Sequence, residues 1–182
     1  MTERRFEILF RENYTSVAQY VARRAPKILV DDVVAETFLV AWRRLDDVPR
    51  EALPWLLATA RRTLSTQMRG ALRRQLLNER LAQQPKLLTA GDDRGGTSEL
   101  AESVGGALAR LSQRDREAIQ LIAWEGLTPR EAAAVIGERP ATFRVRLHRA
   151  KRRLRKLLEP IPVVEVKSAL DLHPAVKEVA PQ

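Results

Sequence analysis

The sequence predicts an all-α protein of two small helical domains joined by a flexible linker, the second domain containing a helix-turn-helix. Helix formers such as Ala, Leu, Arg and Glu dominate, and apolar residues recur at three- and four-residue intervals. Val and Ile seldom alternate with polar residues over the length of a strand. A glycine-containing stretch near the middle separates two blocks with helical periodicity.

We expect the first domain to span residues 1–84 and the second to span residues 99–158. The intervening segment, 85–98, carries three glycines in 14 residues and is predicted to be the flexible linker. The last segment, 159–182, contains four prolines without a clear period, so we expect a loose tail.

Three helices are predicted in the first domain. The first follows a stripe of apolar residues and ends at Pro26; the stripe consists of Phe6, Leu9, Phe10, Tyr14, Val17 and Val21. The second begins near Asp31-Asp32, since carboxylates suit a helix N-terminus, and continues to about Leu45. The third has Pro54 in its first turn and runs towards Met68, and Gly70 is expected to interrupt it.

Charge points to a polyanionic partner. The net charge is +9, and Lys and Arg near phosphates gain affinity by releasing counterions. Eight basic residues and no acid lie between Arg144 and Lys156, whereas acids gather around the helix at 32–45. Basic and acidic residues are thus concentrated in different predicted helices, which a generally basic surface would not require.

Several classes of protein are disfavoured. There is no cysteine, which excludes disulfides and thiolate zinc sites, and the only histidines, His148 and His173, lie far apart in the chain. With no phosphate-binding glycine loop and no acid–base pair, we expect no enzyme, no cofactor and no metal. No apolar run approaches the roughly 20 residues of a membrane span, so we expect a cytoplasmic protein without a membrane segment.

A capping box marks the start of the predicted helix-turn-helix. Thr128 supplies an N-cap hydroxyl, Pro129 the first helical position, and Glu131 the carboxylate three residues after the cap. The short helix 129–136 is followed by Gly137 as the turn residue, and the next helix begins near Pro140.

The second helix of this motif has two distinct faces. A core stripe is formed by Phe143, Leu147, Ala150, Leu154 and Leu157. The outward face, expected to read bases in the major groove, carries Arg144, Val145, His148 and Arg149. Phosphate contacts are assigned to Thr128, Arg130, Arg146 and Lys151. The alternative is a solvated basic helix without a partner.

The helix at 32–45 is too apolar for a single stripe. A core face would use Val34, Phe38, Ala41 and Leu45, which leaves Val33, Ala35, Leu39 and Trp42 to be covered. Either the helix is central and packed on several sides, or it docks another protein's helices while Asp32 and Glu36 pair with cations.

The third helix combines an aromatic residue with arginines, the combination that binds single-stranded DNA by stacking and by phosphate contacts. The residues are Trp55, Arg61, Arg62, Arg69, Arg73 and Arg74. Trp55 can equally be a core anchor near the start of the helix.

Three segments in this order resemble regions two and four of the extracytoplasmic-function (ECF) sigma factors of the sigma-70 family. They read DDVVAETFLVAWRRL, PWLLATARRTLSTQMR and LARLSQRDREAIQLIAWEGLTPREAAAVIGERPATFRVRLHRAKRRLRKLL. The resemblance covers about 150 residues, from Phe6 to Leu158. It implies an alternative sigma factor that binds core RNA polymerase and directs promoter-specific initiation.

The resemblance also implies roles and partners. Core polymerase would contact Asp32, Ala35, Glu36, Phe38 and Trp42. Melting of the promoter −10 element would use Trp55, Arg61, Arg62, Met68, Arg69 and Arg73, with a non-template base captured in a loop near 68–72. The outward face of the helix at 141–156 would read the duplex −35 element, and an anti-sigma factor is a further expected partner.

Departures from the family pattern leave alternatives open. Ala35 replaces a usual glutamine, Arg62 and Thr66 replace an asparagine and an aspartate, and Val145 replaces a small polar or charged residue. A DNA-binding regulator with a sensor domain would share the helix-turn-helix, and a sigma-like protein that binds polymerase without initiating would tolerate Ala35.

Overall fold

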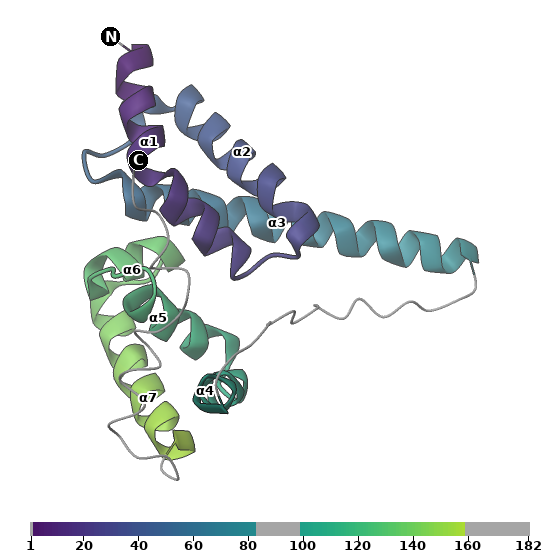
Figure 1. Cartoon of the computed structure of the whole chain (residues 1–182), viewed down its shortest axis with the longest axis vertical. Helices are drawn as coiled ribbons and strands as arrows, with labels where there is room; N and C mark the ends of the chain where they lie inside the picture. Colours follow the sequence, from purple (N-terminus) through teal and green to yellow (C-terminus); the bar gives the residue numbers. More distant parts are fainter. Residues whose placement is uncertain (1, 83–98, 159–182) are drawn as a thin grey trace. The chain divides into compact units, whose positions relative to one another are not determined.

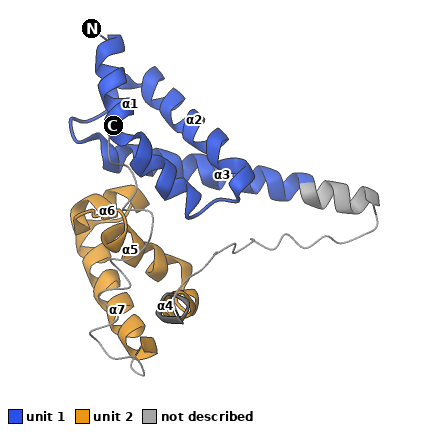
Figure 2. Ribbon diagram, viewed as in Figure 1, with its two compact units in different colours: residues 1–92 blue, residues 93–182 orange. Residues whose placement is uncertain are grey.

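The computed structural model describes residues 2–82 and 99–158. Within these ranges all regular secondary structure is helical, and no strand is present (Figure 1). The chain forms two compact units, Met1–Asp92 and Asp93–Gln182 (Figure 2). The all-α prediction with two helical domains is therefore confirmed. The predicted linker 85–98 and tail 159–182 lie outside the described residues.

The first unit consists of α1 (Thr2–Ala22), α2 (Lys27–Arg43), a 3-10 turn (Leu45–Asp47) and α3 (Ala52–Ala82). Each of the three α-helices packs against the other two. Their shared core contains fully buried residues from every helix: Val17, Tyr20, Val21, Val33, Thr37, Leu56 and Leu57. Arg5 of α1 also donates a 2.9 Å hydrogen bond to the carbonyl of Val48, which ties α1 to the segment before α3.

The start of α2 differs from the prediction. The helix begins at Lys27, directly after Pro26, so Asp31 and Asp32 lie in its second turn instead of at its N-terminus. Pro26 is the N-cap with φ −56° and ψ 142°, and it makes no side-chain capping bond. α1 ends earlier, at Ala22, and the proline ring marks the boundary of α2, since its fixed φ orients the chain for a new helix without help from an acid.

Gly70 does not interrupt α3, contrary to the prediction. The helix continues through this residue to Ala82, and Figure 1 shows it extending beyond α1 and α2. A helical glycine costs about 1 kcal/mol relative to alanine, which a helix anchored in the core by Leu56, Leu57 and Leu64 can absorb.

The second unit consists of α4 (Glu99–Ala109), α5 (Gln113–Ala123), α6 (Pro129–Ile136) and α7 (Pro140–Leu158). The long helix α7 packs against each of the other three.

The predicted core stripe of α7 is confirmed at four of its positions, because Phe143, Leu147, Ala150 and Leu154 are buried. At the C-terminal end Leu158 is buried and Leu157 only half-buried, so the prediction that Leu157 completes the core stripe was wrong. Steps of three and of four residues both return to one helix face, and the neighbouring helices decide which of the two positions is covered.

Candidate nucleic-acid interface

The capping box at the start of α6 is present as predicted. The backbone N–H of Thr128 donates to Glu131 Oε2 at 2.7 Å, and the N–H of Glu131 donates to Thr128 Oγ1 at 3.3 Å. The Thr128 hydroxyl also donates to Glu131 Oε2 at 2.6 Å. These bonds from Thr128 stabilise the carboxylate and lower the pKa of Glu131. The start of the helix-turn-helix is therefore fixed by local bonds alone.

Gly137 forms the turn between α6 and α7. Its φ of 73° and ψ of 31° lie in the left-handed region, which glycine adopts without a Cβ clash. The following residue, Glu138, donates its N–H to the carbonyl of Ala133 at 2.9 Å, and Gly137 donates to Ala134 at 3.2 Å. These bonds satisfy the last carbonyls of α6 and direct the chain into α7.

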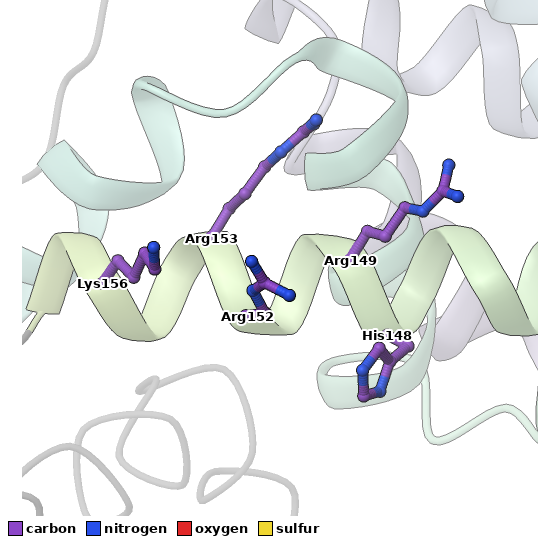
Figure 3. Close-up of a pocket in the computed structure, with 5 residues that line it drawn as sticks. All are labelled: His148, Arg149, Arg152, Arg153 and Lys156. Atoms are coloured by element: carbon purple, nitrogen blue, oxygen red, sulfur yellow. The ribbon is translucent and has the colours of Figure 1, made fainter.

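The four residues assigned to base reading are all exposed on α7: Arg144, Val145, His148 and Arg149. Val145 is 51% exposed, although it is apolar. Figure 3 shows an open pocket along the same helix, lined by His148, Arg149, Arg152, Arg153 and Lys156. The four residues are therefore exposed as expected, two of them, His148 and Arg149, line a basic pocket, and their role in reading bases stays a prediction.

The residues assigned to phosphate contacts fall into two groups. Arg130 and Lys151 are exposed. The other two make bonds within the protein: the Thr128 hydroxyl belongs to the capping box, and the Arg146 guanidinium is bound to Glu138. The Glu138 carboxylate accepts from Arg146 and raises its pKa.

A second internal ion pair anchors α7 further along. Arg153 Nη1 lies 2.5 Å from Asp115 Oδ2, where the aspartate side chain is 7% exposed and that of the arginine 63%. Asp115 sits in the first turn of α5, and its N–H donates to the Ser112 cap at 3.2 Å. The pair joins α5 to α7 across 38 residues of sequence.

On α2 the structure separates a covered side from an open one. Val33 and Phe38 are buried, whereas Asp32 and Ala35 are exposed and Glu36 is half-buried. Trp42 keeps 43% of its surface exposed. The first unit therefore leaves part of this apolar helix uncovered. Phe38, which had been assigned to polymerase contact, lies within the unit and is 3% exposed, and its role stays a prediction.

An aromatic cluster, defined by Phe6, Phe10, Tyr14, Phe38 and Trp42, joins α1 to α2. The Phe6 and Trp42 rings meet edge to face at 4.9 Å, and Phe10 and Phe38 lie 4.7 Å apart. Phe10 is 39% and Tyr14 43% exposed, so the apolar stripe of α1 is partly a surface. Sequence reasoning missed this extension. The signal was available, because the α1 stripe was wider than one buried face needs.

The residues assigned to −10 melting lie along one continuous helix. Steps of seven, seven and four residues put Trp55, Arg62, Arg69 and Arg73 on one face of α3. Trp55 is half-buried, and the three arginines are exposed. Arg61 is half-buried and Met68 is 45% exposed.

The expected base-capturing loop near 68–72 is absent, since these residues are helical. Helix formers on both sides of Gly70 outweigh the cost of the single glycine, so the backbone continues its i to i−4 bonds.

Two kinds of site find no support among the described residues. No group of His, Cys, Asp or Glu side chains within 2–82 and 99–158 could hold a metal ion. In the same ranges, no helix combines the length and the apolar character that crossing a membrane requires.

Comparisons with known proteins agree with this architecture. The model of the family "Sigma-70, region 4" matches residues 101–154. The ECF RNA polymerase sigma factor SigL of Mycobacterium tuberculosis is 31% identical over 137 residues, which cover 73% of this chain and 76% of SigL. The RNA polymerase sigma factor CnrH of Cupriavidus metallidurans is 33% identical over 145 residues, covering 74% of this chain and 75% of CnrH.

Solved structures give the same result. The sigma factor RpoE, crystallised with the anti-sigma factor NepR from Bartonella quintana, is similar at a TM-score of 0.63 and 25% identity. The match covers 86% of this chain and 98% of RpoE. CnrH, solved in complex with the cytosolic domain of CnrY, is similar at a TM-score of 0.58 and 28% identity, over 88% and 91% of the two chains.

Proposed function

The chain belongs to the ECF sigma factors of the sigma-70 family, and we propose that its two helical units divide promoter recognition and polymerase binding between them. As a member of that family it is an alternative sigma factor, which binds core RNA polymerase and directs promoter-specific transcription initiation. Different residues of the two units carry each of these tasks.

The second unit reads the duplex −35 element through the exposed face of α7. The observation that carries this assignment is the arrangement of α6 and α7, in which a capped helix and a left-handed glycine turn precede an exposed cationic helix. Arg144 and Arg149 can donate two hydrogen bonds to a guanine edge, whereas Arg130 and Lys151 contact phosphates. Val145 offers an apolar contact, for which the thymine methyl is the matching group.

The first unit opens the −10 element along α3. The face formed by Trp55, Arg62, Arg69 and Arg73 offers an aromatic ring and three guanidinium groups to the non-template strand. An aromatic ring stacks on any base, and guanidinium groups follow the phosphates, so one helix face supports an unpaired strand. With 68–72 helical, the exposed side chains of Met68 and Leu72 replace the expected loop as candidates for contact with an unstacked base.

Core polymerase binds the open side of α2 together with the exposed rings of the aromatic cluster. Trp42 supplies a large, half-exposed ring of the kind that dominates binding energy at interfaces. Leu39 adds apolar area, while Asp32 and Glu36 can pair with cations of the partner. Ala35 presents only a methyl group, so a helix of the polymerase can approach closely at this point.

An anti-sigma factor is a further proposed partner. RpoE and CnrH, the two structures described above, were each solved with a partner protein, and NepR is named an anti-sigma factor. The chain acts in the cytoplasm, where promoter DNA and polymerase meet, and we assign it no catalytic step of its own.

Run-off transcription tests the proposed function. Purified chain is added to sigma-free core polymerase on a library of genomic fragments, and discrete starts that depend on the chain are expected. Aligning these starts gives both promoter elements. Duplex binding without transcripts and without co-elution with core polymerase would overturn the proposal in favour of a DNA-binding regulator. Co-elution without transcripts would instead identify a polymerase-binding protein that does not initiate.

Arg149→Ala then tests the assignment of α7. If Arg149 reads a base, its loss weakens binding to the −35 duplex by about 1–3 kcal/mol and relaxes the preference at one base pair. Binding is measured by fluorescence anisotropy on the −35 duplex and on single-base variants. A loss that is equal on every sequence would make Arg149 a phosphate contact, and Lys151→Ala provides that pattern as a matched control.

A further inference from the structure

An internal ion pair lies within the helix-turn-helix, between Glu138 and Arg146. Arg146 Nη2 donates to Glu138 Oε1 at 2.6 Å, and Arg146 Nε donates to Glu138 Oε2 at 3.2 Å. Both side chains are mostly covered, with 22% of the arginine and 20% of the glutamate exposed. Two parallel bonds between a guanidinium and a carboxylate fix the orientation of both groups, not only their distance.

The pair joins the turn of the motif to the helix that follows it. Glu138 comes directly after the left-handed Gly137, and its backbone N–H is bonded to the carbonyl of Ala133 in α6. Arg146 lies eight residues further along, in the second turn of α7. The carboxylate therefore links the end of α6 to α7, and restrains the direction in which α7 leaves the turn.

Arg146 belongs to a flank of α7 that bonds the protein itself. Arg153 lies seven residues later on the same side of the helix and bonds Asp115 of α5. These two arginines are thus bound by acids from preceding elements, whereas the base-reading face carries Arg144 and Arg149. Figure 3 shows Arg153 and His148 projecting from opposite sides of the α7 ribbon, and Arg149 projecting to the same side as Arg153.

The charge of the pair matters for binding DNA. A free Arg146 next to the base-reading face would attract phosphates of any sequence, and a free Glu138 carboxylate would repel them. Bound to each other, the two groups have no net charge, so this part of the surface adds little to the sequence-independent attraction that counterion release provides.

We propose that Glu138 is a positioning and specificity-determining residue, which holds the recognition helix against the turn and keeps Arg146 from binding phosphate. The inference rests on the proposed function, because it assumes that α7 binds duplex DNA. It replaces the expectation from the sequence that Arg146 is a phosphate contact. The consequence is a lower affinity for random duplex and a larger ratio of specific to non-specific binding.

Glu138→Gln is the first variant. The amide keeps the shape of the side chain and removes its charge, which frees Arg146 to bind phosphate. On a scrambled duplex at several salt concentrations, affinity should rise and the slope of log K against log salt should steepen by about 0.9. The ratio of affinities for the promoter duplex and the scrambled duplex should fall. Lys151→Gln is the matched control, and its slope should become shallower by about 0.9.

The double variant Glu138→Gln/Arg146→Gln separates the two roles of Arg146. It removes one positive and one negative charge, so the salt slope should equal that of the unsubstituted chain. A slope that is shallower by about 0.9, as for Lys151→Gln, would show that Arg146 already binds phosphate and would overturn the inference.

Folding and the proposed function are checked separately. Far-ultraviolet circular dichroism of each variant, at the temperature of the binding assay, must match that of the unsubstituted chain, and slopes are compared only between folded proteins. If the unsubstituted chain fails to prefer the promoter duplex, the proposed role of α7 falls. If it shows that preference and Glu138→Gln leaves slope and ratio unchanged, only the role of Glu138 falls.

Discussion

The helices α2 and α7 are both assigned to partner binding, but they prepare for it in opposite ways. On α7 the covered and the open face differ in kind, since Phe143 is fully buried and Arg144, beside it in sequence, is exposed. On α2 large apolar residues lie on both sides, since Val33 is fully buried and Trp42 is 43% exposed, although the open side also carries the exposed Asp32. The open side of α2 thus presents mainly apolar area, whereas that of α7 presents mainly charge.

The difference shows how a surface suits its partner. A cationic face binds a polyanion through charge, and water solvates it well when DNA is absent. An apolar face binds another protein by excluding water, and it remains exposed whenever that protein is absent. The aromatic cluster limits this exposure, because Phe6 packs edge to face on Trp42.

The largest effect is expected when the aromatic residue of α7 is removed. Phe143→Ala deletes a fully buried ring and leaves a cavity, so the free energy of unfolding should fall by about 3–5 kcal/mol. Urea unfolding followed by circular dichroism measures this change. Val145→Ala, at a position that is 51% exposed, should change stability by no more than about 0.5 kcal/mol. Equal losses for the two variants would contradict the division of α7 into two faces.

The aromatic residue of α2 should behave differently. Trp42→Ala should weaken binding to core polymerase by about 2 kcal/mol, since a half-exposed tryptophan is a typical anchor at an interface. Loss of its contact with Phe6 should reduce stability by only about 0.5–1.5 kcal/mol. Binding is measured by competition for core polymerase, with Val145→Ala as a control of similar exposure in the other unit. Unchanged binding would exclude Trp42 from the polymerase interface.

The two units also contrast in how they use glycine. Gly137 has a φ of 73°, so Gly137→Ala should destabilise the second unit by about 1–2 kcal/mol. Gly70 is helical, and a Cβ there would meet only Arg74 Nη1, at 3.9 Å. Gly70→Ala should therefore raise the free energy of unfolding by about 0.5–1 kcal/mol. Thermal unfolding of both variants provides the comparison, and destabilisation by Gly70→Ala would revive the expected break in α3.

The smallest effect concerns helix capping and pH. In the folded protein the bonds from Thr128 lower the pKa of the Glu131 carboxyl below its unfolded value. The unfolded state then binds more protons in acid, so this stabilisation is complete above the unfolded pKa and is lost as pH falls through the folded one. Glu131→Gln should remove that part of the pH dependence, an effect of below about 1 kcal/mol. Unfolding measured between neutral and acidic pH tests it, and an identical pH profile for the variant would contradict the assignment.

The N-terminus of α2, in contrast to that of α6, has no side-chain capping bond. Pro26 makes no side-chain capping bond, so this cap provides no titrating group of its own. Amide exchange in the first turn of α2 should therefore show no acid-dependent loss of protection that is linked to its cap.

The sequence by itself determined the features that depend on neighbouring residues. The capping box of Thr128 and Glu131, the left-handed turn at Gly137 and the basic face of α7 all follow from spacing within one or two helical turns. Such features are encoded locally, because a hydrogen bond to residue i+3 or a positive φ needs no distant partner. The two helical units and the family could be predicted for the same reason, from the order and spacing of these signals.

Only the tertiary structure decided which residues are covered and which ions are paired. Phe38 is buried and Phe10 partly exposed, because the two rings pack against each other where α1 meets α2. Arg146 and Arg153 look like DNA-binding residues in the sequence, yet they bond Glu138 and Asp115, which packing brings beside them. The pattern of a helix gives the direction of each side chain, and only its neighbours determine what that side chain meets.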